Sequence, residues 1–151
     1  MLIRRRRRRG ATAVENAFVL PVMFILILGI MVLGLGIFHY SQMSYLAREG
    51  ARWASVHGAQ YANETGNAAA TAADVYTNAI QPKMTTLDSS KFSYAVTWNT
   101  NNNPYHTVID GNNNLVKVGN TVTVMVSYSW VPEAYFIPVT LTSTSVMPMS
   151  Y

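Results

Sequence analysis

The chain contains no cysteine among its 151 residues. Disulfide bonds, metal sites built from thiolates and catalysis by a cysteine nucleophile are therefore excluded. The sequence also lacks the H-E-x-x-H motif of metalloproteases, the glycine loop that cradles phosphate and the G-x-S-x-G turn of serine hydrolases. These absences argue against the enzyme classes that are most readily identified from sequence.

Charged side chains make up only 12% of the sequence, and those that could do chemistry are scattered. The three histidines, His39, His57 and His106, do not have the spacing of metal ligands. The seven carboxylates show no recurring pair suited to acid–base catalysis. We therefore expect no catalytic residue, no metal and no cofactor.

The net charge of +4 does not indicate a nucleic-acid-binding surface. Six of the eleven basic residues form one run near the N-terminus, namely Arg4, Arg5, Arg6, Arg7, Arg8 and Arg9. The rest of the chain has five basic and seven acidic residues. An arginine run beside a long apolar segment is typical of a membrane topology signal, because arginine resists translocation and stays in the cytoplasm. We expect no nucleic acid partner.

The apolar segment covers residues 17–38, and fifteen of its 22 residues are Ile, Leu, Val or Phe. As a helix it would extend roughly 33 Å, which matches the hydrocarbon core of a bilayer. A cleaved secretory signal peptide fits poorly, because the apolar run is too long and no small-x-small site follows promptly. An unprocessed signal anchor remains open. Either way, the sequence predicts one membrane span with a cytoplasmic N-terminus.

The helix is expected to continue beyond the membrane to Val56, since nothing breaks it before His57 and Gly58. Leu46, Trp53 and Val56 fall on one side at helical spacing. We expect this side to be half buried against the domain that follows.

The remaining sequence predicts a small α+β domain. A second helix is expected over residues 68–80, capped by Asn67 and stopped by Pro82. Alternation with a period of two then predicts strands at residues 92–98, 105–109, 115–118, 121–130 and 139–147. We predict an antiparallel sheet of about three to four strands, with Val124 and Val126 facing its interior. The predicted organisation is a basic leader at residues 1–10, the membrane helix and its extension at 11–56, and an extracytoplasmic domain at 57–151.

Three stretches carry a family resemblance. Residues 9–21, RGATAVENAFVLP, resemble the start of TadE-like proteins, minor pseudopilins of the tight-adherence (Flp) pilus and part of the type IV pilin-like superfamily. Residues 46–54, LAREGARWA, are similar to the A-R-E-G-A-R segment of that family. Residues 121–128 and the following Pro132 are similar to its late strand and proline-broken turn. One departure is Asn16, where this class often has Phe or Tyr.

The resemblance implies that a membrane aspartic prepilin peptidase cuts between Gly10 and Ala11. Glu15 would then be the fifth residue of the mature chain, the position that pilin-like proteins use in assembly. The new amine of Ala11 would be its assembly contact in a neighbouring subunit. The implied partners are the prepilin peptidase, other pilins or pseudopilins, and the pilus assembly platform. The implied location is the prokaryotic inner membrane.

The predicted function is a non-enzymatic, single-pass minor pseudopilin that assembles or anchors a tight-adherence pilus or a related secretion machine. The alternative is an unprocessed, membrane-anchored module whose extracytoplasmic sheet binds a ligand. A pseudopilin loses its ten-residue leader, whereas a tethered module keeps it. A membrane-bound hydrolase would need a convergent polar pocket, for which the sequence gives no indication.

Overall fold

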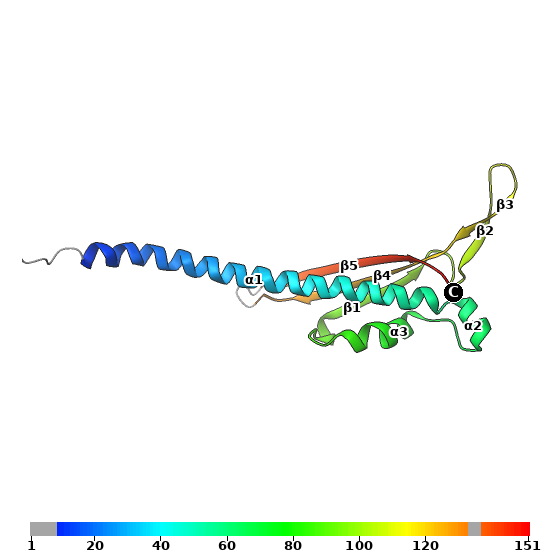
Figure 1. Ribbon diagram of the computed structural model, residues 1–151, viewed down its shortest axis with the longest axis horizontal. Helices are drawn as coiled ribbons and strands as arrows, with labels where there is room; N and C mark the ends of the chain where they lie inside the picture. The colour runs from blue at the N-terminus through cyan, green and yellow to red at the C-terminus, as the bar shows by residue number, and fades with distance from the viewer. Residues whose placement is uncertain (1–8, 133–136) are drawn as a thin grey trace, which may run out of the picture.

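The computed structural model describes residues 9–132 and 137–151 (Figure 1). One helix of 48 residues, α1 (Arg9–Val56), runs through most of the length of the molecule. All other elements gather around its C-terminal half, so its N-terminal half stands alone. The molecule is therefore an α+β domain on a long helical stalk, as the sequence predicts.

Helix α1 ends where the sequence predicts. His57 Nδ1 donates a hydrogen bond of 2.8 Å to the carbonyl oxygen of Trp53 and so satisfies one acceptor of the last turn. Gly58 follows, and a Cβ at this position would collide with the carbonyl oxygens of Asn102 and Tyr151. The chain needs glycine here because three backbone segments meet closely.

The main sheet has three antiparallel strands, β1 (Phe92–Trp98), β4 (Thr121–Trp130) and β5 (Val139–Pro148), in the order β1-β4-β5. Val124 of the central strand pairs with Val96 on one side and Ser145 on the other. The predicted strand boundaries agree with these elements to within one residue. The sheet lies along the C-terminal half of α1 (Figure 1).

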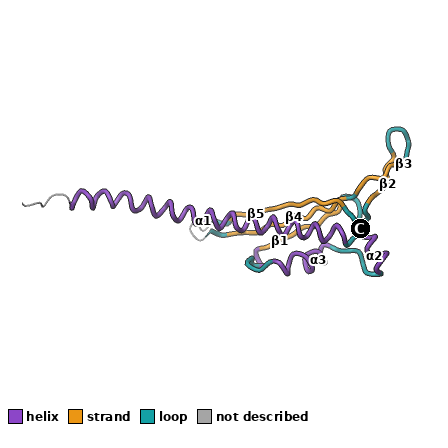
Figure 2. Tube along the Cα trace, in the orientation of Figure 1, coloured by secondary structure: helices purple, strands orange, loops and turns teal. Residues whose placement is uncertain are grey.

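A separate hairpin, β2 (Tyr105–Ile109) and β3 (Leu115–Gly119), projects from the end of the domain farthest from the start of α1 (Figure 2). The carboxylate of Asp110 closes its turn by accepting from the amides of Asn112 and Asn114 at 2.8 Å. The predicted strands are thus correct, but they form a second sheet.

The core lies between α1 and one face of the main sheet. Val122, Val124 and Val126 are completely buried, whereas Met125, on the opposite face of β4, is 42% exposed. The alternation of β4 therefore sets which face packs on the helix. The helix contributes five buried apolar side chains to this core: Met43, Leu46, Ala47, Ala51 and Ala54.

The predicted packing face of α1 is partly wrong. Leu46 is buried and Trp53 packs at the edge of the core, but Val56 is 41% exposed. The buried face instead follows the small residues Ala47, Ala51 and Ala54. Small side chains allow the sheet to approach the helix closely, and three alanines decide the face more strongly than one valine near the helix end.

The prediction for the second helix needs correction. Residues 59–65 form an unpredicted helix, α2 (Ala59–Thr65), which ends at Gly66 in the left-handed conformation with φ of 73°. Helix α3 (Ala72–Val75) is capped by Thr71 and not by Asn67. Thr71 and Asp74 bond each other's backbone N–H, a reciprocal pair that satisfies two donors where asparagine alone satisfies one.

Helix α3 continues as a π-helical segment, η1 (Tyr76–Ile80), and two short 3₁₀ turns follow, η2 (Gln81–Lys83) and η3 (Ser89–Lys91). Ile80 is completely buried, as expected for an anchor of this segment. The segment lies along one flank of α1, beside the sheet (Figure 1).

Candidate functional site

Among the residues that the structure describes, none packs over the N-terminal part of α1. Its large apolar side chains are exposed, among them Phe18 (75%), Ile25 (69%) and Leu33 (68%). Within the described ranges 9–132 and 137–151, α1 is the one helix long and apolar enough to cross a membrane, and its most apolar window has a mean hydropathy of 2.9 with none of it buried. By length and composition, this bare helix fits the predicted single-pass anchor.

The predicted cleavage site lies at the very start of this helix. Gly10 and Ala11 belong to the first turn of α1, and Glu15 lies one turn further along. The run Arg4 to Arg8 lies outside the described residues, and Arg9 is the first residue of the helix. Positions 11 and 15 are four apart and so lie on nearly the same side of the helix.

Nothing in the described part of the chain requires glycine at position 10. A Cβ there would meet no atom within 4 Å, and Gly10 does not have a positive φ. The side chain of Glu15 is exposed, and it forms no hydrogen bond or ion pair within the part of the chain that the structure describes. Packing within one subunit therefore gives no reason for either residue.

The second predicted segment, residues 46–54, has a clear packing role. Gly50 faces both the sheet and η1, where an added Cβ would lie 3.2 Å from Ile80 Cδ1 and 3.2 Å from Val124 Cγ1. Ala47 and Ala51, on either side of it, are completely buried. The small residues of this segment therefore form the surface of α1 against which the sheet and η1 pack.

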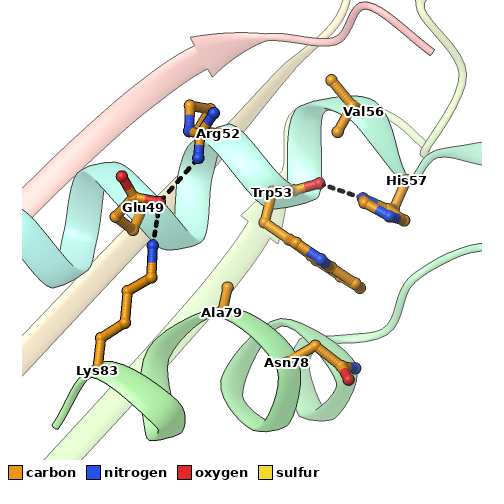
Figure 3. Close-up of a pocket in the computed structure, with 8 residues that line it drawn as sticks. All are labelled: Glu49, Arg52, Trp53, Val56, His57, Asn78, Ala79 and Lys83. Atoms are coloured by element: carbon orange, nitrogen blue, oxygen red, sulfur yellow. Dashed lines mark hydrogen bonds and ion pairs between the residues drawn. The ribbon is translucent and has the colours of Figure 1, made fainter.

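The charged residues of the same segment face outward. Glu49 accepts hydrogen bonds from Lys83 Nζ at 2.7 Å and from Arg52 at 3.1 Å (Figure 3). Lys83 holds the pKa of Glu49 below its usual range, with Arg52 adding to the effect, and Glu49 in turn raises the pKa of Lys83. The Glu49–Lys83 pair ties η2 to α1 across 34 residues of sequence.

A pocket of about 300 Å³ opens beside this ion pair (Figure 3). Trp53 and His57 stack with ring centroids 3.9 Å apart on one side of it. The charge of Glu49 is already neutralised by two cations, and His57 Nδ1 is engaged at the helix end. The pocket thus offers an aromatic wall without an acid–base pair, and among the described residues no three His, Cys, Asp or Glu side chains cluster to hold a metal.

Two features of this region have no signal in the local sequence. One is the Glu49–Lys83 pair, and the other is the contact of Trp130 with Gly36, where an added Cβ would lie 3.1 Å from the indole ring. Both join residues far apart in the chain. Gly36 is compatible with a close approach, but a glycine in an apolar helix does not identify Trp130 as the residue that packs on it.

Residues 10–52 match the family described as TadE-like protein, which confirms the resemblance along this part of the chain. The match does not extend to the third resembling stretch, residues 121–132. The match contains Gly10, Glu15 and the A-R-E-G-A-R segment, and it ends in the last turns of α1. No curated protein and no solved structure matches this chain.

Proposed function

Because residues 10–52 are TadE-like, we propose that this chain is a minor pseudopilin that assembles or anchors a tight-adherence pilus or a related secretion machine in a prokaryotic inner membrane. The observation that carries the proposal is the division of the matched segment. Its first part is a bare apolar helix that begins with Gly10 and Glu15. Its second part packs against the sheet and η1 of the domain. An anchored subunit that assembles through its helix needs both parts.

Leader removal is the first step of the proposed function. A prepilin peptidase would cut the bond between Gly10 and Ala11. A peptidase acts on an extended backbone, whereas Gly10 and Ala11 lie in the first helical turn. This turn must therefore open before cleavage, and it is the turn that opens most easily because its first N–H groups have no partner within the helix. Glycine at position 10, which packing does not require, lowers the cost of the extended form.

Cleavage would then create the assembly contact. The new α-amino group of Ala11 carries a positive charge close to the hydrocarbon edge. An ionised Glu15 at the same depth is costly without a partner. Pairing Glu15 of one subunit with the amine of its neighbour would offset both costs and fix the axial offset between the two helices.

The intact mass of the purified chain tests the proposal. Co-expression with an active prepilin peptidase should yield protein that begins at Ala11, and Gly10→Val should yield protein that still begins at Met1. Since a side chain at position 10 meets no described atom within 4 Å, Gly10→Val should unfold at the same temperature as wild type made without the peptidase. Wild-type protein that keeps Met1 beside an active peptidase would favour the alternative, an unprocessed anchored binding module.

A further inference from the structure

The end of the main sheet that points toward the bare helix carries exposed apolar side chains. Strand β4 finishes and β5 begins at this end, where Trp130 pairs with Val139 (Figure 1). We call the four residues Trp130, Val131, Ile137 and Val139 the sheet tip. Val131 is 39% exposed, Val139 43% and Ile137 68%. Residues 133–136 lie outside the described residues and are not part of this surface.

The sheet tip lies level with the end of the predicted membrane span. Trp130 packs over Gly36, where an added Cβ would lie 3.1 Å from its ring, and its ring centroid is 5.5 Å from that of His39. Gly36 is two residues before the end of the span at Phe38. Trp130 therefore lies beside the last turn of helix that the hydrocarbon can cover.

The position of Glu15 limits how far the helix can slide in the membrane. From Glu15 to Gly36 the helix rises roughly 32 Å, close to the thickness of a hydrocarbon core of about 30 Å. Moving Gly36 out into water would pull the Glu15 carboxylate into lipid, which is costly. With Glu15 at one interface, Gly36 and the sheet tip are at the other.

We propose that the sheet tip is a lipid-binding surface that inserts into the membrane interface beside α1. Val131, Ile137 and Val139 are exposed, Trp130 packs beside the exposed apolar part of α1 at Gly36, and none of the four residues is charged. Tryptophan is enriched at this depth because its ring is amphipathic. Two attachments to the membrane, the helix and the tip, hold the domain at one angle to the bilayer.

The absence of cysteine allows a direct test in the full chain. Single cysteines at Ile137, Leu115 and Leu35 can each carry an environment-sensitive fluorophore in vesicles of phosphatidylcholine and phosphatidylglycerol. Leu115, on the distant hairpin, is the matched control because it is also apolar and is 76% exposed. Leu35, in the span, reports that the helix is inserted.

We expect iodide in the water to quench the Ile137 label several-fold less than the Leu115 label. Nitroxide-labelled lipids should quench the Ile137 label several-fold more than the Leu115 label. Equal iodide quenching at Ile137 and Leu115, with Leu35 protected, would overturn the inference. Iodide quenching at Leu35 as well would show that α1 is outside the bilayer and would overturn the membrane placement from which the inference starts.

The lipid-to-protein ratio separates lipid from a second copy of the chain. Protection of Ile137 by lipid should not change when the vesicles are diluted with excess lipid. Protection that disappears on dilution would assign the sheet tip to a contact between copies, and would overturn the proposal.

Discussion

Two glycines of the family-matched segment show how differently one residue type is used. Gly10 has open space around it, whereas Gly50 lies within 3.2 Å of both the sheet and η1, measured from an added Cβ. Glycine in a helix costs about 1 kcal/mol relative to alanine, so each needs a compensating reason. Packing supplies the reason at Gly50. At Gly10 the described residues supply none, which supports a role in processing.

Glu15 also needs a compensating reason, because a carboxylate near the hydrocarbon edge is costly. We predict that Glu15→Gln leaves expression, insertion and leader cleavage unchanged but lowers piliation and co-purification with pilus subunits. Glutamine keeps the size of the side chain and removes the charge that would pair with the Ala11 amine. Membrane fractionation, intact mass and electron microscopy of cells measure these effects.

The matched control for this variant is Glu64→Gln. It removes the same charge from an exposed position on α2, far from the start of α1. We expect normal piliation from this control. Normal piliation from Glu15→Gln would show that the Glu15 carboxylate is not an assembly contact in this chain.

The ion pair between Glu49 and Lys83 predicts a dependence of stability on pH. The pKa of Glu49 is lowered chiefly by Lys83, so the folded state binds its proton less readily than the unfolded state. The pair therefore stabilises the fold above the usual pKa of Glu49, near 4.5, and this contribution is lost as the pH falls through the lowered value. The effect is small, because the pair is partly solvated.

Lys83→Met tests this directly. It should raise the pKa of Glu49 toward its usual value, and NMR titration of the labelled Glu49 carboxyl in detergent micelles would detect the change. The variant should unfold at a slightly lower temperature than wild type at pH 7, and at the same temperature as wild type once Glu49 is protonated in both. Lys117→Met, on the hairpin, should leave the pKa of Glu49 unchanged. An unaltered Glu49 pKa in Lys83→Met would contradict the assignment.

At the scale of elements, local patterns predict the strands and the end of α1 correctly, but they misplace the start of the second helix. The alternation in β4 is written in ten consecutive residues, so neither its limits nor its buried face depended on distant contacts. Both Asn67 and Thr71 can cap a helix, and only the reciprocal bonds of Thr71 with Asp74 decide between them. The hairpin was predicted in sequence, but its separation from the main sheet depends on the buried Asn120, which donates to Asn101 and to the carbonyl of Asn103 at 2.8 Å each.

The loss of stability caused by a new aspartate in β4 should depend on which face of the strand carries it. We expect Val124→Asp to destabilise the protein by about 3 kcal/mol or more, since it places an unpaired carboxylate between α1 and the sheet. Met125→Asp, one residue further on and 42% exposed, should change stability by less than about 1 kcal/mol. Limited proteolysis of the two variants provides the measurement. Equal sensitivity to protease would mean that the carboxylate at 124 finds solvent, contrary to the packing described above.

At the scale of the whole molecule, the chain divides into a part built for lipid and a part built for water. These two parts meet within α1 and not at its end. The sheet already contacts the helix at Gly36, so the last twenty residues of α1 belong to the domain. Local sequence could not show this, because α1 is one uninterrupted helix and the contact comes from Trp130.

This division predicts the topology of the whole chain. The arginine run should hold the N-terminus in the cytoplasm, so the domain should lie on the opposite side of the membrane. Tyr151 reports the side of the domain faithfully, because its amide donates to the carbonyl oxygen of Ser55 at 3.2 Å and so ties the C-terminus to the far end of α1. A reporter enzyme active only outside the cytoplasm, fused after Tyr151, should therefore be active. A cytoplasm-specific reporter at the same position should be silent.

Replacing the six arginines by asparagine should weaken the preference for a cytoplasmic N-terminus. The apolar span would still insert, but it would no longer carry a charge difference that orients it. A strong signal from the cytoplasm-specific reporter on the wild-type chain would place the domain inside the cell, where it could not join a pilus.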